Sequence, residues 1–207
     1  MRTARVGAKL FVADGEEVDL PSFIGIFHGW IQRTAVDGLL IDVADYQHVP
    51  DGPGVMLIGH EADRALDLAG GRPGMLYQHK RQEPPPELGD GLRRAVREAA
   101  LGARELGDEP LLDGGLRFRA DELWVRVTDG LAGQHDDASF AELEAALDDL
   151  LEDLGVADGA QIVRDDVPGG PLAATVRLPA DLGLDALIDR LADAPPVAAE
   201  SAAGGAS

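Results

Sequence analysis

The pattern of hydrophobic and polar positions changes along the chain and predicts a mixture of strands and helices. A short apolar run at 8–12, ending at the turn Asp14-Gly15, predicts a strand. From Leu20 onward, hydrophobic residues recur at helical spacing on one stripe, which predicts a helix with Asp19 as its N-cap. Short apolar or alternating runs separated by Gly, Pro and Asp then predict a β-meander, with strands at 39–46, 54–61, 63–69 and 74–81.

The second part of the chain begins after the proline run 84–86, where the spacing predicts a helix over 88–106. The alternation at 116–129 predicts either a hairpin or one long strand. Leucines at helical spacing over 143–154 predict the clearest helix, with Ser139 and Glu142 as its capping box. Two further strands and a last short helix are expected at 160–165, 172–178 and 184–193.

This order of elements predicts an α+β fold, with antiparallel sheets covered by helices on one face. The two parts resemble each other in element order, which is compatible with two ferredoxin-like halves. We therefore expect an N-terminal half with the meander at 1–83, a connecting helix at 84–110 and a C-terminal half at 111–194. The small-residue tail at 195–207 is expected to be disordered.

Composition excludes several kinds of chemistry. The chain has no cysteine, which removes disulfides, thiolate metal sites and cysteine nucleophiles. Serine is scarce and lies at expected helix starts or in the tail, so a serine hydrolase is not indicated. A net charge of −20 disfavours nucleic-acid and acidic membrane partners, which are bound largely through Lys and Arg.

The charge is uneven along the chain. Residues 1–81 carry 8 basic and 11 acidic side chains, so this part is nearly neutral and the acidity lies beyond it. No apolar run approaches the ~18 residues that a membrane-spanning helix needs, and the N-terminus is typical of a strand rather than a signal peptide. We therefore expect a cytoplasmic protein.

Histidines and acids gather in the nearly neutral part. Pairing 63–69 with 74–81 around the Gly-rich turn would place His79 opposite Asp63, within reach of His60 and Glu61. Imidazole and carboxylate groups are ligands that divalent transition metals accept, so these four residues are the predicted metal site. The alternative is a solvated strand end with ordinary surface side chains.

A second candidate surrounds the turn Gly52-Pro53-Gly54. Tyr46, His48 and Asp51 flank it and form either the rim of a ligand pocket or a stiff surface loop. The glycines precede a strand rather than opening a helix, so a phosphate-binding loop is not indicated. The predicted ligand-binding residues are therefore Tyr46, His48, His60, Glu61, Asp63 and His79.

These observations leave three functional hypotheses open. The first is a non-catalytic protein that binds a small ligand or another protein through its N-terminal half, with a homodimer as one form of partner. The second is a metal-dependent hydrolase using His60, His79 and the nearby acids. The third is an accessory subunit of a larger assembly, tethered by its C-terminal tail.

Overall fold

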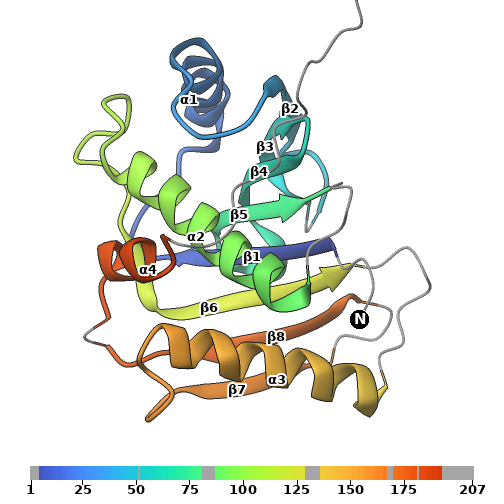
Figure 1. Ribbon diagram of the computed structural model, residues 1–207. Coiled ribbons are helices and arrows are strands. Elements are labelled where there is room, and N and C mark those ends of the chain that lie inside the picture. The colour runs from blue at the N-terminus through green and yellow to red at the C-terminus, as the bar shows by residue number, and fades with distance from the viewer. Residues whose placement is uncertain are drawn as a thin grey trace, which may run out of the picture.

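The computed structural model describes residues 5–50, 52–80, 87–128, 136–166, 170–180 and 182–192. Within these residues, eight strands form one antiparallel sheet in the order β2-β3-β4-β5-β1-β6-β8-β7 (Figure 1). The strands are β1 (Arg5–Val12), β2 (Leu40–Tyr46), β3 (Gly54–Gly59), β4 (Ala62–Asp67), β5 (Gly74–His79), β6 (Phe118–Thr128), β7 (Gln161–Asp165) and β8 (Leu172–Arg177).

Four α-helices of the described chain cover one face of this sheet. They are α1 (Leu20–Arg33), α2 (Leu88–Gly107), α3 (Asp137–Asp153) and α4 (Leu184–Arg190). α1 packs on β2 and β3, α2 on β1 and β5, α3 on β7, and α4 on β6 (Figure 1). No helix among the described residues is long and apolar enough to cross a bilayer.

Alternation along the strands separates a helix-covered face from an open face. In β1, Val6, Ala8, Leu10 and Val12 belong to the hydrophobic core beneath the helices. Their neighbour Lys9 therefore points to the opposite, open face, because successive side chains of a strand alternate. The same alternation places Asp67, Gln78 and Arg126 on the open face, where Lys9, Ala65 and Leu76 are nonetheless buried.

The predicted α+β class is confirmed, and so is the four-stranded meander from β2 to β5. Within the segment at 116–129, residues Phe118–Thr128 form the single long strand β6. The ferredoxin-like halves are not confirmed, because β1 pairs with β6 and joins all the strands into one continuous sheet. The expected boundary at 84–86 and the tail at 195–207 lie outside the described residues.

Of the two expected helix caps, Asp19 is the N-cap residue of α1, whereas Ser139 is not that of α3. α3 begins at Asp137, and the side chain of Asp136 accepts a hydrogen bond of 2.8 Å from the backbone N–H of Ser139. The capping box with Ser139 as N-cap is therefore wrong, since an acid three residues earlier takes the capping position. Asp19 does precede α1, but its carboxylate accepts from the Ser22 hydroxyl and makes no capping bond to the backbone.

Candidate functional site

The register between β4 and β5 separates the residues of the predicted metal site. His79 pairs with Ala62, while Asp63 pairs with Gln78. The register assumed from the sequence is therefore wrong by one residue, and such a shift moves a side chain to the other face of the sheet. His79 lies on the helix-covered face and is buried, whereas Asp63 lies on the open face.

The remaining residues of that prediction have local partners. His60 is exposed, and its Nδ1 lies 3.2 Å from Oε1 of Glu61. Asp63 accepts a hydrogen bond of 2.8 Å from Nζ of Lys80. Among the described residues, no group of three or more histidines and acids is placed to hold a metal ion.

The predicted pocket rim lies at the other end of the β2–β3 pair. Tyr46 pairs with Gly54, whereas His60 follows the far end of β3 at Gly59. Tyr46 and His48 are both exposed. The structure therefore does not bring these two residues together with His60, and Asp51 lies outside the described residues.

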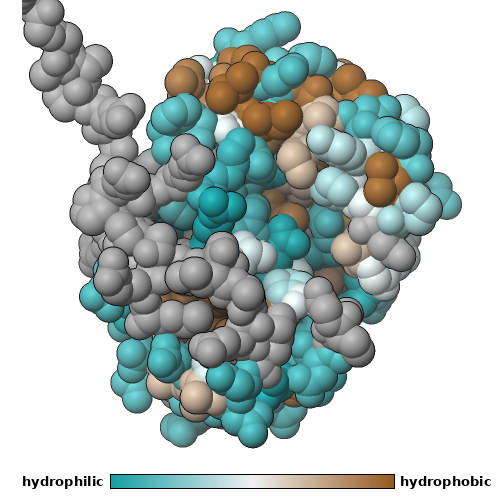
Figure 2. All heavy atoms as spheres, turned by 90° about the vertical axis from the view of Figure 1, so that its right-hand side faces the viewer, coloured by the Kyte–Doolittle hydropathy of each residue, from teal (hydrophilic) through white to brown (hydrophobic). Residues whose placement is uncertain are grey.

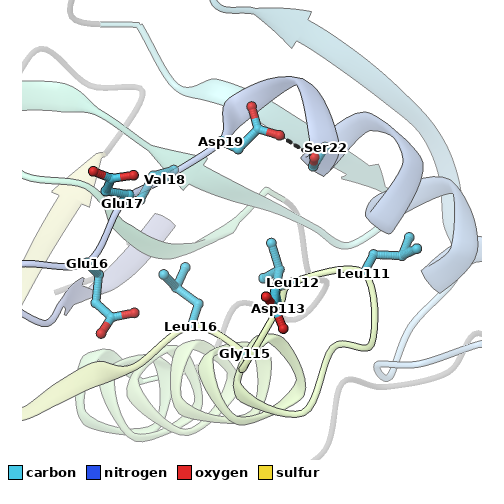
Figure 3. Close-up of a pocket in the computed structure, with 10 residues that line it drawn as sticks. All are labelled: Glu16, Glu17, Val18, Asp19, Ser22, Leu111, Leu112, Asp113, Gly115 and Leu116. Atoms are coloured by element: carbon cyan, nitrogen blue, oxygen red, sulfur yellow. Dashed lines mark hydrogen bonds between the residues drawn. The ribbon is translucent and has the colours of Figure 1, made fainter.

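A pocket of about 510 Å³ opens between the β1–α1 connection and the segment after α2. Its lining includes Glu16, Glu17, Asp19 and Asp113, together with Leu111, which is 63% exposed. Figure 3 shows these carboxylates spread around the rim, with Asp19 bonded to Ser22. The acidic groups do not converge on one point, so this hollow resembles a solvated surface more than a built site.

A second pocket, of about 240 Å³, lies on the open face of the sheet. We call it the Arg126 pocket, and its lining includes Met56, Asp63, Ala65, Asp67, Leu76, Gln78 and Arg126. Strand pairing aligns Met56, Ala65 and Leu76 in one cross-strand row, which gives an apolar floor. The next row places Asp63 beside Gln78, and Gln78 beside Gly7, which pairs with Arg126.

The charged groups around the Arg126 pocket differ in how they are neutralised. Lys9 donates to Oδ2 of Asp67 at 2.6 Å, and both side chains are buried. Burial lowers the pKa of Lys9, an effect that Asp67 opposes. Asp63 is paired with Lys80. By contrast, no carboxylate of the described chain pairs with Arg126, whose pKa is lowered by burial.

Gly7 controls how Arg126 is held. Nε of Arg126 donates to Oε1 of Gln78, although the strand β1 runs between their two strands. A Cβ at Gly7 would lie 2.5 Å from that Gln78 oxygen. The bond across β1 therefore depends on the absence of a side chain at Gly7.

A buried polar cluster occupies the helix-covered face. Nη2 of Arg64 donates to Oε2 of Glu98 at 2.5 Å, beside Tyr77. Within the described chain, the buried side-chain atoms without a hydrogen-bond partner are Nε of Arg64, OH of Tyr77, Nε2 of His79 and Nε of Arg97. The cavity beside Arg64 and Tyr77 measures about 10 Å³, which is room for a single water-sized group. It is too small for an organic ligand.

Comparison of the chain with protein-family models, with curated proteins and with solved structures finds no match.

Sequence reasoning missed most residues of the Arg126 pocket. Lys9 carried a signal, because a lysine inside the apolar run 8–12 indicates a buried ion pair. Arg126 carried none, since it alternates with Val125 and Val127 as any outward residue of a strand would.

Proposed function

We propose that this chain is a non-catalytic binding protein that holds a small organic molecule in the Arg126 pocket. The observation that carries the proposal is a concave site with an apolar floor and a few polar groups at its edge. Small-molecule sites have this composition, with polar groups that fix the orientation of the ligand. Most of the pocket lining belongs to the nearly neutral N-terminal part, and β6 contributes Arg126.

The size of the pocket limits the ligand. Its volume of about 240 Å³ lies below the ~300–1,000 Å³ that is usual for drug-sized ligands. The buried pair Lys9–Asp67 and the partly exposed pair Lys80–Asp63 are each neutralised internally and form polar walls. A compact molecule with an apolar body therefore suits this space better than a nucleotide or a peptide.

The test is a thermal-shift screen of small metabolites of every charge class, run on wild-type protein and on Met56→Trp. Met56 is half-buried in the pocket lining, so an indole there fills part of the space. Val163→Trp is the matched control, because Val163 lies at the far edge of the same sheet face and is 45% exposed. Compounds that stabilise wild type and Val163→Trp but not Met56→Trp support the proposal. If the screen finds no compound with that dependence, the proposal is contradicted.

A second candidate function is pairing with another protein chain through β2. This strand lies at one edge of the described sheet, so one side of its backbone is unpaired there. Leu39 and Ile41 are 63% and 55% exposed. Figure 2 shows hydrophobic residues gathered at the height of α1 and β2, above a hollow lined mainly by hydrophilic residues. An unpaired edge strand with apolar neighbours supports strand addition, including that of a second copy.

The oligomeric state tests this second function. Light scattering coupled to gel filtration should show a dimer for wild type and for Val163→Lys at the opposite edge strand. Ile41→Lys should give a monomer, because a lysine on an edge strand opposes strand pairing. A wild-type monomer over the whole accessible concentration range would count against self-pairing.

The accessory subunit and the cytoplasmic location stay predictions. The metal-dependent hydrolase stays one too, although two of its proposed ligands, His79 and Asp63, lie on opposite faces of the sheet.

A further inference from the structure

We propose that the ligand of the Arg126 pocket is an organic monocarboxylate whose carboxylate binds Arg126 and whose hydrocarbon part covers Met56, Ala65 and Leu76. This inference rests on the proposed binding function and names the chemical class of its ligand. It depends on the charge balance of the pocket, on the way in which Arg126 is held, and on the apolar floor.

The charge balance leaves one positive charge in the pocket. Asp67 and Asp63 are the carboxylates in its lining, and each already has a lysine partner, at 2.6 and 2.8 Å. Arg126 has no carboxylate partner in the described chain, and Asp67 is the charge that favours its protonated form. Since arginine stays charged at neutral pH, a ligand with one negative charge would neutralise it.

Gln78 orients the guanidinium of Arg126. Gln78 accepts the hydrogen of Nε, so this nitrogen is used inside the protein. Within the described residues, the terminal nitrogens of Arg126 have no hydrogen bond, and the guanidinium carbon lies 5.6 Å from the centre of the Trp124 ring. A guanidinium has five N–H donors, and a carboxylate can accept from two of them side by side. Gln78 thus acts as a positioning residue, and Gly7 allows it to do so.

The neighbouring row of side chains is apolar on β3, β4 and β5. Met56 pairs with Ala65, and Ala65 pairs with Leu76, so one apolar strip adjoins the row that holds Gln78 and Arg126. A hydrocarbon chain or ring would occupy the pocket above this strip, where Met56 is half-buried and Ala65 and Leu76 are buried, while its carboxylate reaches Arg126. Each CH₂ group of the ligand that leaves water in this pocket strengthens binding.

Other head groups suit the site less well. A phosphate monoester carries close to two negative charges, while the two lysines are already engaged with Asp67 and Asp63. An ammonium group would meet Arg126 as a like charge. An alcohol would leave the half-buried guanidinium further desolvated without a counter-charge, which is costly.

The test compares three molecules with the same hydrocarbon chain and different head groups: hexanoate, 1-hexanol and hexylammonium. Their affinities are measured by NMR titration of the full-length wild-type protein at constant ionic strength, with butyrate and benzoate added to vary the body. Because a hydrogen-bonded charge pair is stronger than a neutral contact, we expect a carboxylate to bind about tenfold to a hundredfold more tightly than the alcohol. This comparison uses wild type alone and so does not depend on the folding of a variant.

Variants then assign the effect to Arg126. Arg126→Met should remove the preference for hexanoate over hexanol, while Arg177→Met should preserve it. Arg177 is an exposed arginine on the same face of the sheet, outside the pocket lining. Urea unfolding of each variant shows whether it is folded.

The outcomes separate this inference from the proposed function. The monocarboxylate assignment would be overturned if the alcohol or the amine bound as tightly as hexanoate or more tightly. It would also be overturned if hexanoate, butyrate and benzoate all failed to bind, or if hexanoate binding survived Arg126→Met. The binding function itself would still stand if the wider screen found another compound that depends on Met56. A screen without any such compound would remove both.

Discussion

Arg126 on β6 donates its Nε hydrogen to Oε1 of Gln78 on β5, over the backbone of Gly7 on the strand between them. This bond joins β6 to β5 across β1 at the edge of the pocket. It fixes the direction of Arg126, the one cation of the pocket with which no described carboxylate pairs. Gly7 is the residue on which the arrangement depends.

Gly7→Ala should therefore weaken ligand binding through Gln78. The new Cβ would lie 2.5 Å from Oε1 of Gln78 and 3.1 Å from the backbone oxygen of Tyr77, so the amide must move away from Arg126. We expect hexanoate affinity to fall several-fold, and the free energy of unfolding to fall by about 1–3 kcal/mol. Gly183→Ala is the control, since nothing lies within 4 Å of a Cβ there. Unchanged affinity in Gly7→Ala would show that Gln78 does not position Arg126.

The buried pair Lys9–Asp67 should be costly to break. Lys9→Met leaves Asp67 buried without its counter-ion, and the exposed fractions of the two side chains are 3% and 7%. We expect a loss of about 3–5 kcal/mol in the free energy of unfolding, measured in urea. The double variant Lys9→Met/Asp67→Leu should recover most of that loss, because it removes both charges together. If the double variant is as unstable as the single one, the cost comes from lost packing.

His79 should make stability depend on pH on the acid side of neutrality. Burial, then the charges of Arg94 and Arg5, lower its pKa below the ordinary value of 6.5. The unfolded chain therefore takes up a proton near pH 6.5 while the folded chain does not, so stability falls as the pH drops below 6.5. Urea unfolding between pH 5 and pH 7.5 should show a shallower slope for His79→Gln than for wild type. His28→Gln, at an exposed position of α1, should keep the wild-type slope.

Two helical glycines should respond oppositely to alanine. Gly25 in α1 has nothing within 4 Å of a Cβ, so Gly25→Ala should stabilise the protein by about 0.5–1 kcal/mol. At Gly102 in α2 a Cβ would collide with the side chain of Met75, so Gly102→Ala should destabilise it by about 1–3 kcal/mol. Thermal unfolding of both variants checks the packing of α2 on β5, and equal effects would contradict it.

The sequence predicts the elements of this fold better than its site, for a physical reason. Hydrophobic periodicity is local, and it correctly indicates α1, α2 and the meander strands. Periodicity does not reveal the register of two strands. The turn that contains Gly70 and Gly71, both at positive φ, decides which residue faces Asp63. A shift of one residue carried His79 to the other face and removed the predicted metal geometry.

The Arg126 pocket is harder still to foresee. Gly7, Gln78 and Arg126 come from three strands, and their contact exists because β1 lies between β5 and β6 in the sheet. Nothing in the local pattern around any of the three indicates that order. Of the residues near the pocket, Lys9 alone has a signal in the sequence, because a charged residue within an apolar run requires a buried partner.

The most direct test of ligand binding in the Arg126 pocket is chemical-shift mapping of ¹⁵N-labelled protein during a titration with hexanoate. The proposal predicts saturable shifts centred on the amides of Ala65, Leu76, Gln78 and Arg126. Shifts centred instead on the acidic hollow around Glu17 and Asp113, or shifts that never saturate, would contradict it.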